Sequence, residues 1–537
     1  MMSMDDGMDK AGARLFLVYL LGLVAFLGGL SLAKGGLYVD RHEGDTLHLI
    51  EIVLRMADGE WPHLDFVTPL GALSFLPIVG FVKAGFGVGT AILLAQISVA
   101  LLLVPMVWWL GYSRLSRGMA YGVGALVMVL VLAMIHGEAT ASISLSMHYN
   151  RWAWALAFTS ILIAVLDPKR APNQWADGIV FGIAFSFFVM GKITFGVAFA
   201  PGVAVALILR GQWRAIVVAI GVVAVVGLAL TLMAGAALWP AYLADLALVA
   251  SSDIRPRAGE DLATLLTAPQ YVLGTVVLVL CVVVLRRGVN PTLGLVLMLL
   301  GPGMIYVTYQ NYGNDPKWLA LLAVMVLAVS RTPQIIALAV VACTLIAPSF
   351  YNMATSAVRH LVADRAGYTA LFADTLYAER HGDFFTKTDR ADNILVRTPM
   401  VFGSEEFAYL NERAEHSPLP EFQGEKLTHC VQQLGMIGVS HAIARDMDTA
   451  GLSEGKSVFV ADTIGNFWMF GGLEPTSGAA PWYYGQLKGY ENADYFLIPA
   501  CPTTPQAYRS ILADVAARGE ELKEIRRTEL YTLYERP

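Results

Sequence analysis

The chain of 537 residues is 56% hydrophobic and only 15% charged, and its mean hydropathy is +0.57. A composition this apolar excludes an ordinary soluble protein and is typical of a chain that crosses a membrane many times, with membrane lipids as its surroundings. The net charge of −6 excludes the strongly basic surface that nucleic-acid-binding proteins carry, so no nucleic-acid partner is expected.

Eleven apolar runs have the composition of membrane-spanning helices, each of which needs about 20 residues. They lie near residues 14–33, 89–110, 119–136, 151–166, 175–191, 195–209, 213–236, 269–285, 291–308, 316–330 and 333–350. A further apolar stretch, residues 69–86, is interrupted by Pro77, Gly80, Lys83 and Gly85. It is predicted either to dip into the membrane and return or to add crossings, which gives about 11 to 13 transmembrane helices in a multi-pass α-helical membrane protein.

Basic and polar loops alternate between these runs. The short basic loops are residues 113–117, 167–170, 210–214 and 286–288. The long or polar loops are residues 136–151, 191–196, 238–270 and 310–318. Because lysine and arginine collect in cytoplasmic loops, the first set is predicted to face the cytoplasm and the second set the outside.

The composition changes after residue 350. Residues 351–537 contain no run long enough to span a membrane, and they alternate between strand-like and helix-like patterns, which predicts a soluble α/β domain outside the membrane. The strand-like segments are residues 393–402, 457–464, 494–501 and 529–536, and the helix-like segments are residues 426–451 and 505–527. Cys430 and Cys501 both fall here, so a disulfide between them is one option in an oxidising compartment.

Ionisable residues gather immediately after the first apolar run, in residues 38–72. They are Asp40, Arg41, His42, Glu43, Asp45, His48, Glu51 and Asp65. Apolar residues at helical spacing predict a helix that begins near Asp45 and ends near Gly59. An acidic residue at a helix start is often only a cap. The density of carboxylates and histidines around Asp45 favours a functional site instead.

The order of these features resembles the GT-C superfamily of membrane glycosyltransferases, which use sugars linked to polyprenyl phosphate. That superfamily includes the dolichyl-phosphate-mannose protein mannosyltransferases and the bacterial lipid A aminoarabinose transferases. Its pattern has Asp-Glu, a helix, Gly and a proline-containing turn. Here Asp45 precedes Gly59 by 14 positions, Thr46 replaces the Glu, and residues 62–71 supply the turn.

The resemblance implies a fold and a reaction. The fold would be a GT-C transmembrane catalytic domain, residues 1–350, whose first outer loop is residues 35–88, followed by the extracytoplasmic domain of residues 351–537. The reaction would transfer a sugar from a polyprenyl-phosphate donor to an envelope glycan, lipid or protein acceptor, with inversion at the anomeric carbon. It would take place on the outer face of a bacterial inner membrane, with the C-terminal domain in the periplasm. Acceptor binding is the role that the resemblance implies for that domain.

Such a reaction needs a base and a cluster of cations. A carboxylate takes the proton of the acceptor hydroxyl, and Asp45 or Glu43 is the candidate. Cations stabilise the departing phosphate. The candidate substrate-binding residues are His42, His48, Asp65, His148, Asn150, Arg151, Lys192, Arg255, Arg257 and Lys317. Two of these residues also fit purely structural roles. Arg151 fits the belt of aromatic and basic residues at a membrane interface, and Lys192 fits a lysine that extends toward the lipid headgroups.

Three questions stay open at this level. A divalent metal, Mg²⁺ or Mn²⁺, is an option that the sequence leaves open. A transporter or flippase for polyprenyl-linked glycans is a rival function, although no repeat symmetry supports it. A non-catalytic membrane assembly protein of the same fold is the other rival.

Overall fold

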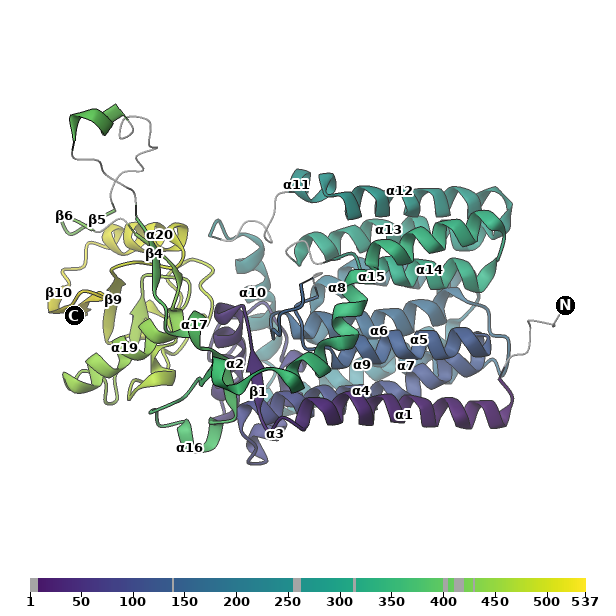
Figure 1. The fold of residues 1–537 in the computed structure, drawn as a ribbon, viewed down its shortest axis with the longest axis horizontal. Coiled ribbons are helices and arrows are strands. Elements are labelled where there is room, and N and C mark those ends of the chain that lie inside the picture. The colour runs from purple at the N-terminus through teal and green to yellow at the C-terminus, as the bar shows by residue number, and fades with distance from the viewer. Residues whose placement is uncertain are drawn as a thin grey trace. The chain divides into compact units, whose positions relative to one another are not determined.

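The computed structural model describes residues 8–137, 140–254, 262–311, 315–398, 404–409, 420–427 and 430–537, and it is mostly helical with several short sheets (Figure 1). The chain divides into two compact units. Unit 1 consists of Met1–Asp40, Leu70–Ala236 and Arg257–Ala363. Unit 2 consists of Arg41–Pro69, Ala237–Pro256 and Asp364–Pro537.

Unit 1 is a bundle of helices. Within the described residues, each of the eleven predicted apolar runs is a helix: α1 (Lys10–Leu32), α4 (Val88–Arg114), α5 (Arg117–Leu132), α6 (His148–Val165), α7 (Gln174–Met190), α8 (Ile193–Leu209), α9 (Trp213–Ala234), α12 (Pro269–Val284), α13 (Pro291–Gln310), α14 (Trp318–Val329) and α15 (Pro333–Val362). The shorter elements are β1 (Leu37–Val39), η1 (Ala72–Ser74), α3 (Leu76–Lys83), α11 (Leu262–Thr267) and η2 (Leu285–Val289).

Six helices in the described part of the chain are long and apolar enough to cross a membrane. They are α1, α4, α9, α12 together with η2, α13 and α15. The helices α5, α7, α8 and α14 are apolar but shorter, at 16, 17, 17 and 12 residues. The chain is therefore a helical protein with six candidate membrane spans, and the prediction of 11 to 13 crossings remains a prediction.

Glycines allow the closest helix contacts in unit 1. Gly178 and Gly182 lie one turn apart on α7 and face α9. A Cβ atom at Gly178 would lie 2.7 Å from the carbonyl oxygen of Ala215, and one at Gly182 would lie 2.4 Å from the Cβ atom of Val222. No side chain fits at these distances. This small-xxx-small pattern brings helix backbones together where the hydrophobic effect gives no driving force between helices.

Residues 69–86 do not form one long helix. The helix α3 has eight residues, which is about 12 Å of helix against a hydrocarbon core of about 30 Å. Just before it, the amide of Gly71 donates to the carbonyl of Gly191 over 2.9 Å, and a Cβ atom on Gly71 would meet the carbonyl oxygen of Met190 at 2.1 Å. This segment is therefore a short helix preceded by irregular backbone, and it packs where α7 and α8 meet. That it dips into a membrane and returns remains a prediction.

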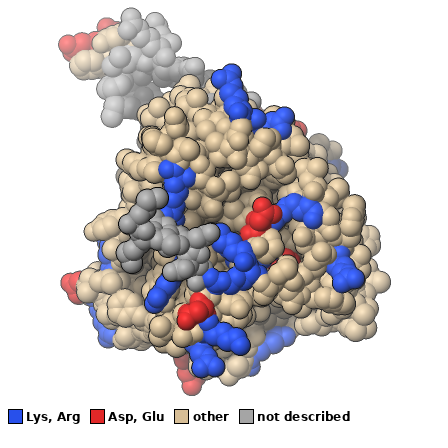
Figure 2. Space-filling view, turned by 90° about the vertical axis from the view of Figure 1, so that its right-hand side faces the viewer, with Lys and Arg blue, Asp and Glu red and all other residues tan. Residues whose placement is uncertain are grey.

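One end of unit 1 is rich in arginine and lysine. The junction of α4 and α5 carries Arg114 and Arg117, and the junction of α8 and α9 carries Arg210 and Arg214. Figure 2 shows Lys and Arg gathered over this end of the helices, with fewer Asp and Glu among them. It is the end that the loop pattern predicts to face the cytoplasm.

Unit 2 contains a four-stranded sheet of order β10-β11-β9-β8, in which β8 runs parallel to β9 and the other pairs are antiparallel. The described strands of unit 2 as a whole are β2 (Tyr368–Ala370), β3 (Phe384–Lys387), β4 (Leu395–Arg397), β5 (Glu421–Phe422), β6 (Glu425–Lys426), β7 (Val431–Leu434), β8 (Val458–Val460), β9 (Tyr495–Pro499), β10 (Lys523–Arg527) and β11 (Tyr531–Glu535). Its helices are α2 (Glu43–Ala57), α10 (Leu238–Ala250), η3 (Arg365–Gly367), α16 (Ala378–His381), α17 (Thr388–Ala391), η4 (Glu405–Phe407), α19 (Met436–Thr449), η5 (Phe467–Phe470), η6 (Tyr490–Asn492) and α20 (Pro505–Ala517).

The four predicted strand segments contain β4, β8, β9 and β11, so the α/β character of this region is confirmed. The two predicted helices were too long. The first begins as strand β7, and Gly435 at φ 80° separates this strand from α19. The second ends as strand β10, which follows a reversal at Gly519 with φ 66°. Glycine is the residue that adopts such left-handed angles without steric cost, so each helix is confined to one side of it.

The two units differ from the predicted division at residue 350. The helix α15 continues to Val362, and two distant segments carrying α2 and α10 belong to unit 2. The helix α2 is buried along its whole length from Thr46 to Met56, and a Cβ atom on Gly44 would lie 3.2 Å from Ile464. Residues 41–69 are therefore a packed part of the α/β unit.

A disulfide links Cys430 to Cys501, which are 71 positions apart, so the bond that the sequence left open is present. We expect the Cys430→Ser/Cys501→Ser variant to lose about 4 kcal/mol of unfolding free energy, because the open chain regains the entropy of that loop. Chemical denaturation of the purified protein measures the loss. Cys343→Ser, at an exposed free cysteine, is the control. Equal denaturation midpoints for wild type and double variant would contradict the prediction.

Candidate functional site

The predicted carboxylates lie in the first turn of α2, where negative charge is stabilised by the helix dipole. The carboxylate of Glu43 accepts from both Nε and Nη2 of Arg390, the latter at 3.0 Å. A carboxylate held by both arms of a guanidinium is poorly placed to take a proton from a substrate. Asp45 is half-buried two positions further on, and it is the residue that matches the Asp of the sequence motif.

The other predicted residues of this loop, His42, His48 and Asp65, each occupy a defined position in or beside α2. His42 precedes α2 with a left-handed φ of 66°. His48 is buried one turn into α2, with its ring edge-on to Trp482 at 5.9 Å. The carboxylate of Asp65 accepts from the amide of Trp61 over 2.6 Å and closes the turn after α2. His42, Glu43 and Asp45 therefore come together at the start of α2, whereas Asp65 shapes the following turn.

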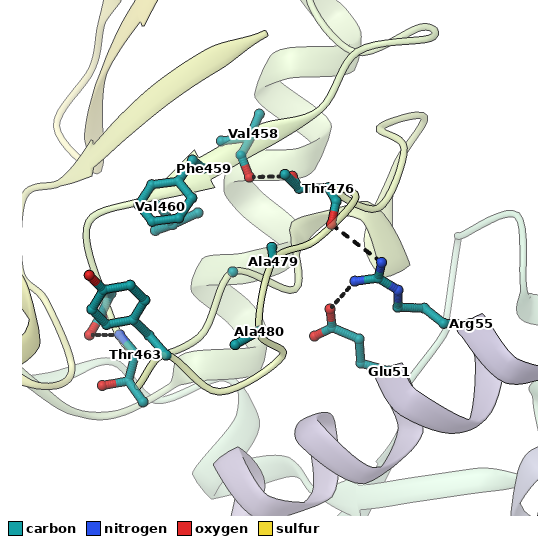
Figure 3. A pocket seen from close by; sticks show the side chains of 12 residues that line it. Glu51, Arg55, Val458, Phe459, Val460, Thr463, Thr476, Ala479 and Ala480 are labelled. Carbon is teal, nitrogen blue, oxygen red and sulfur yellow. Dashed lines mark hydrogen bonds and ion pairs between the residues drawn. The ribbon is translucent and has the colours of Figure 1, made fainter. Parts of the chain in front are cut away.

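Sequence reasoning missed the pair Glu51 and Arg55, which α2 directs into a small cavity of about 30 Å³ (Figure 3). Glu51 Oε1 accepts from Trp468 Nε1 over 3.3 Å and lies 3.9 Å from Arg55 Nη1. Arg55 Nη2 donates to the carbonyl of Thr476 over 3.3 Å. Glu51 Oε2 is buried without a hydrogen-bond partner among the described residues. The spacing of four positions was visible in the sequence, but an exposed helix pair has the same spacing.

Burial raises the pKa of Glu51 to about 7, against the opposing effects of Arg55 and Trp468. The folded protein thus favours the protonated acid. Its contribution to stability is complete below the ordinary pKa of 4.5 and is lost as the pH rises through about 7.

We therefore expect Glu51→Gln to be as stable as wild type near pH 4 and more stable at pH 8. The gain at pH 8 is about 3 kcal/mol, because the amide stays neutral in the cavity. Urea denaturation followed by tryptophan fluorescence between pH 4 and 8 measures the difference. Glu454→Gln, at an exposed position, is the control, and its unfolding free energy should depend on pH as that of wild type does. If the unfolding free energies of Glu51→Gln and wild type changed in parallel with pH, the prediction would be contradicted.

Three predicted cations of unit 1 lie around residues 135–151. Arg151 is buried near the start of α6, and its Nη1 donates to the carbonyl of Ile135. Lys317 Nζ donates to the carbonyl of Gly137 over 2.8 Å. Lys192 Nζ lies 5.1 Å from the ring centroid of Tyr149. We call Arg151, Lys192 and Lys317 the cation cluster.

Two polar residues fix the start of α6 beside the cation cluster. His148 Nε2 lies 3.1 Å from the carbonyl of Ser74, and Asn150 Nδ2 donates to Asn311 Oδ1 over 2.9 Å. Both side chains are buried and have these contacts within unit 1. The predicted Arg255 and Arg257 lie outside the described residues.

Arg151 has donor capacity that the described residues do not use. Nε and Nη2 of Arg151 are buried and have no hydrogen-bond partner in the part of the chain that the structure describes. Leaving buried charged donors unsatisfied is costly, and such residues near a membrane usually face a ligand or a cavity. A phosphate oxygen is the acceptor that suits a guanidinium best.

The described residues contain no group of three or more His, Cys, Asp or Glu side chains arranged to hold a metal ion.

Comparison with known proteins finds no matching family model and no matching curated protein.

Proposed function

We propose that the protein is a GT-C type glycosyltransferase that moves a sugar from a polyprenyl-phosphate donor to an envelope glycan, lipid or protein. The observation that carries the proposal is the cation cluster in a helical unit with candidate membrane spans, where Arg151 has two buried nitrogen atoms without hydrogen-bond partners among the described residues. A lipid-linked phosphate is an anion that reaches such a position. The motif of Asp45, α2 and Gly59 supplies the second line of support.

In the proposed reaction the acceptor hydroxyl attacks the anomeric carbon from the face opposite the phosphate. The bond between that carbon and the phosphate oxygen breaks, and the polyprenyl phosphate leaves with the electron pair, so the configuration inverts. Asp45 takes the hydroxyl proton as the new bond forms. Arg151, Lys192 and Lys317 stabilise the negative charge on the leaving phosphate.

The proposed setting is a bacterial inner membrane with 11 to 13 crossings and with unit 2 in the periplasm. The basic end of unit 1 supports a cytoplasmic location for the helix junctions that carry Arg114 and Arg210. The disulfide of Cys430 and Cys501 supports an oxidising compartment for unit 2.

The test uses the purified full chain in liposomes with a panel of polyprenyl-phosphate sugars labelled in the sugar. Envelope glycan, lipid and protein fractions are supplied as acceptors. We expect release of polyprenyl phosphate together with covalent transfer of label to one fraction. Movement of the intact lipid-linked sugar across the bilayer without cleavage would favour the transporter. Absence of both cleavage and movement with every donor would favour the non-catalytic assembly protein.

A further inference from the structure

A cavity of about 310 Å³ lies beside α10 in unit 2, and its lining includes none of the residues assigned above. Its polar lining consists of Asp245 and Ser251 from the α10 segment and of Gln486 and Lys488 from a neighbouring loop. Two alanines and Leu248 form its apolar lining. The size is near the lower end of small-molecule pockets, which favours a ligand the size of one sugar ring.

The carboxylate of Asp245 is fixed before any ligand arrives. Its Oδ2 accepts from His63 Nδ1 over 2.8 Å and from the amide of Thr68 over 3.1 Å. The bond to the carboxylate places the proton of the neutral imidazole on Nδ1. His63 Nε2 is buried without a hydrogen-bond partner among the described residues. A carboxylate held in one orientation loses little entropy when it binds a hydroxyl group.

The backbone at this cavity is held in sparsely populated conformations. His63 has φ 74°, and the consecutive residues Gln486 and Leu487 have φ 60° and 48°. Left-handed angles are unfavourable for residues other than glycine, and they persist where surrounding contacts enforce them, most often at functional sites. One such contact is the bond from Ser252 Oγ to the carbonyl of Tyr484, at 2.6 Å. The strained loop carries both of its polar lining residues to the cavity.

We propose that this cavity binds a neutral carbohydrate ring. Sugar hydroxyls both donate and accept hydrogen bonds, and the lining offers an acceptor in Asp245, a donor in Lys488 and both in Gln486. Leu248 and the alanines supply an apolar surface for the C–H face of the ring. The carboxylate of Asp245 disfavours phosphorylated or acidic ligands. As a subsite for a glycan acceptor the cavity rests on the proposed function, but sugar binding itself requires no transfer reaction.

The test is saturation-transfer NMR on the full chain in nanodiscs with methyl glycosides of glucose, galactose, mannose and N-acetylglucosamine. We expect at least one glycoside to bind, and Lys488→Ala and Gln486→Gly each to weaken its binding by about threefold to tenfold. Both side chains are exposed, so the variants keep the fold. Gln486→Gly should also raise the melting temperature, because glycine relieves the left-handed angle. Gln423→Gly, at an exposed glutamine with φ 48° in the same unit, should leave sugar binding unchanged.

Absence of binding by all four glycosides, or binding unaffected by both cavity variants, would overturn the proposal. Tighter binding of glucose 6-phosphate than of methyl glucoside would overturn the assignment to a neutral sugar. Failure here with sugar transfer intact in liposomes overturns the subsite alone. Sugar binding in a chain that never cleaves a lipid-linked donor overturns the glycosyltransferase and leaves the carbohydrate site standing.

Discussion

Asp45→Asn is expected to lower sugar transfer by about 10²- to 10⁴-fold, which is the usual contribution of a general base. The amide has the size of the carboxylate but cannot take the proton of the acceptor hydroxyl. Binding of polyprenyl phosphate should stay within about twofold of wild type, because the proposed phosphate contacts come from the cation cluster. Turnover in liposomes and binding of labelled polyprenyl phosphate measure the two effects on one preparation.

Two further variants separate catalysis from folding. Asp58→Asn removes an exposed carboxylate at the other end of α2 and should keep full transfer. Glu43→Gln loses the charge of the pair with Arg390, so its main effect should be on the melting temperature. Sugar transfer by Asp45→Asn at the wild-type rate would contradict the assignment of Asp45 as the general base. A larger catalytic loss in Glu43→Gln than in Asp45→Asn would exchange the two roles.

The helices of unit 1 were predictable because their signal is local. A long apolar run has few alternatives in a membrane, and every predicted run is a helix in the described residues. The helix ends were less predictable. The helix α15 runs past the expected boundary to Val362, because its last turns are amphipathic and carry no break in helical pattern.

The long-range arrangement was not predictable from the sequence. Periodicity identified α2 as an amphipathic helix, but it does not say which surface buries the apolar face. Unit 2 buries α2, so Glu51 faces Trp468, which lies 417 positions away. His63 and Asp245, which are 182 positions apart, carry no local motif at all. Only contact geometry reveals such pairs.

The candidate site was predicted in part for the same reason. Arg151, Lys192 and Lys317 were selected as outer-side cations, and the structure brings all three to the segment around residues 135–151. Glu43 was grouped with Asp45 because the two are close in sequence. The ion pair of Glu43 with Arg390, 347 positions away, could not be predicted from that proximity.

Arg151→Met gives the other large expected effect, and stability and function should respond differently. Binding of polyprenyl phosphate should weaken by about 10- to 100-fold, since each charge-assisted hydrogen bond contributes about 1.5–3 kcal/mol. The unfolding free energy should change by only about 1 kcal/mol. Loss of the bond to Ile135 destabilises the variant, whereas removal of two buried nitrogen atoms that have no partner among the described residues stabilises it.

Arg151→Lys is the matched variant, because it keeps the charge but lacks the fork of N–H donors that holds a phosphate. It should bind polyprenyl phosphate with an affinity between those of wild type and Arg151→Met. A structural arginine predicts the opposite pattern, in which Arg151→Met unfolds at much lower denaturant and retains its phosphate affinity wherever it is folded. Denaturation and lipid-phosphate binding, measured on wild type, Arg151→Met and Arg151→Lys, therefore decide whether Arg151 binds a ligand. Only a ligand-binding role lowers the affinity for polyprenyl phosphate while the unfolding free energy stays nearly constant.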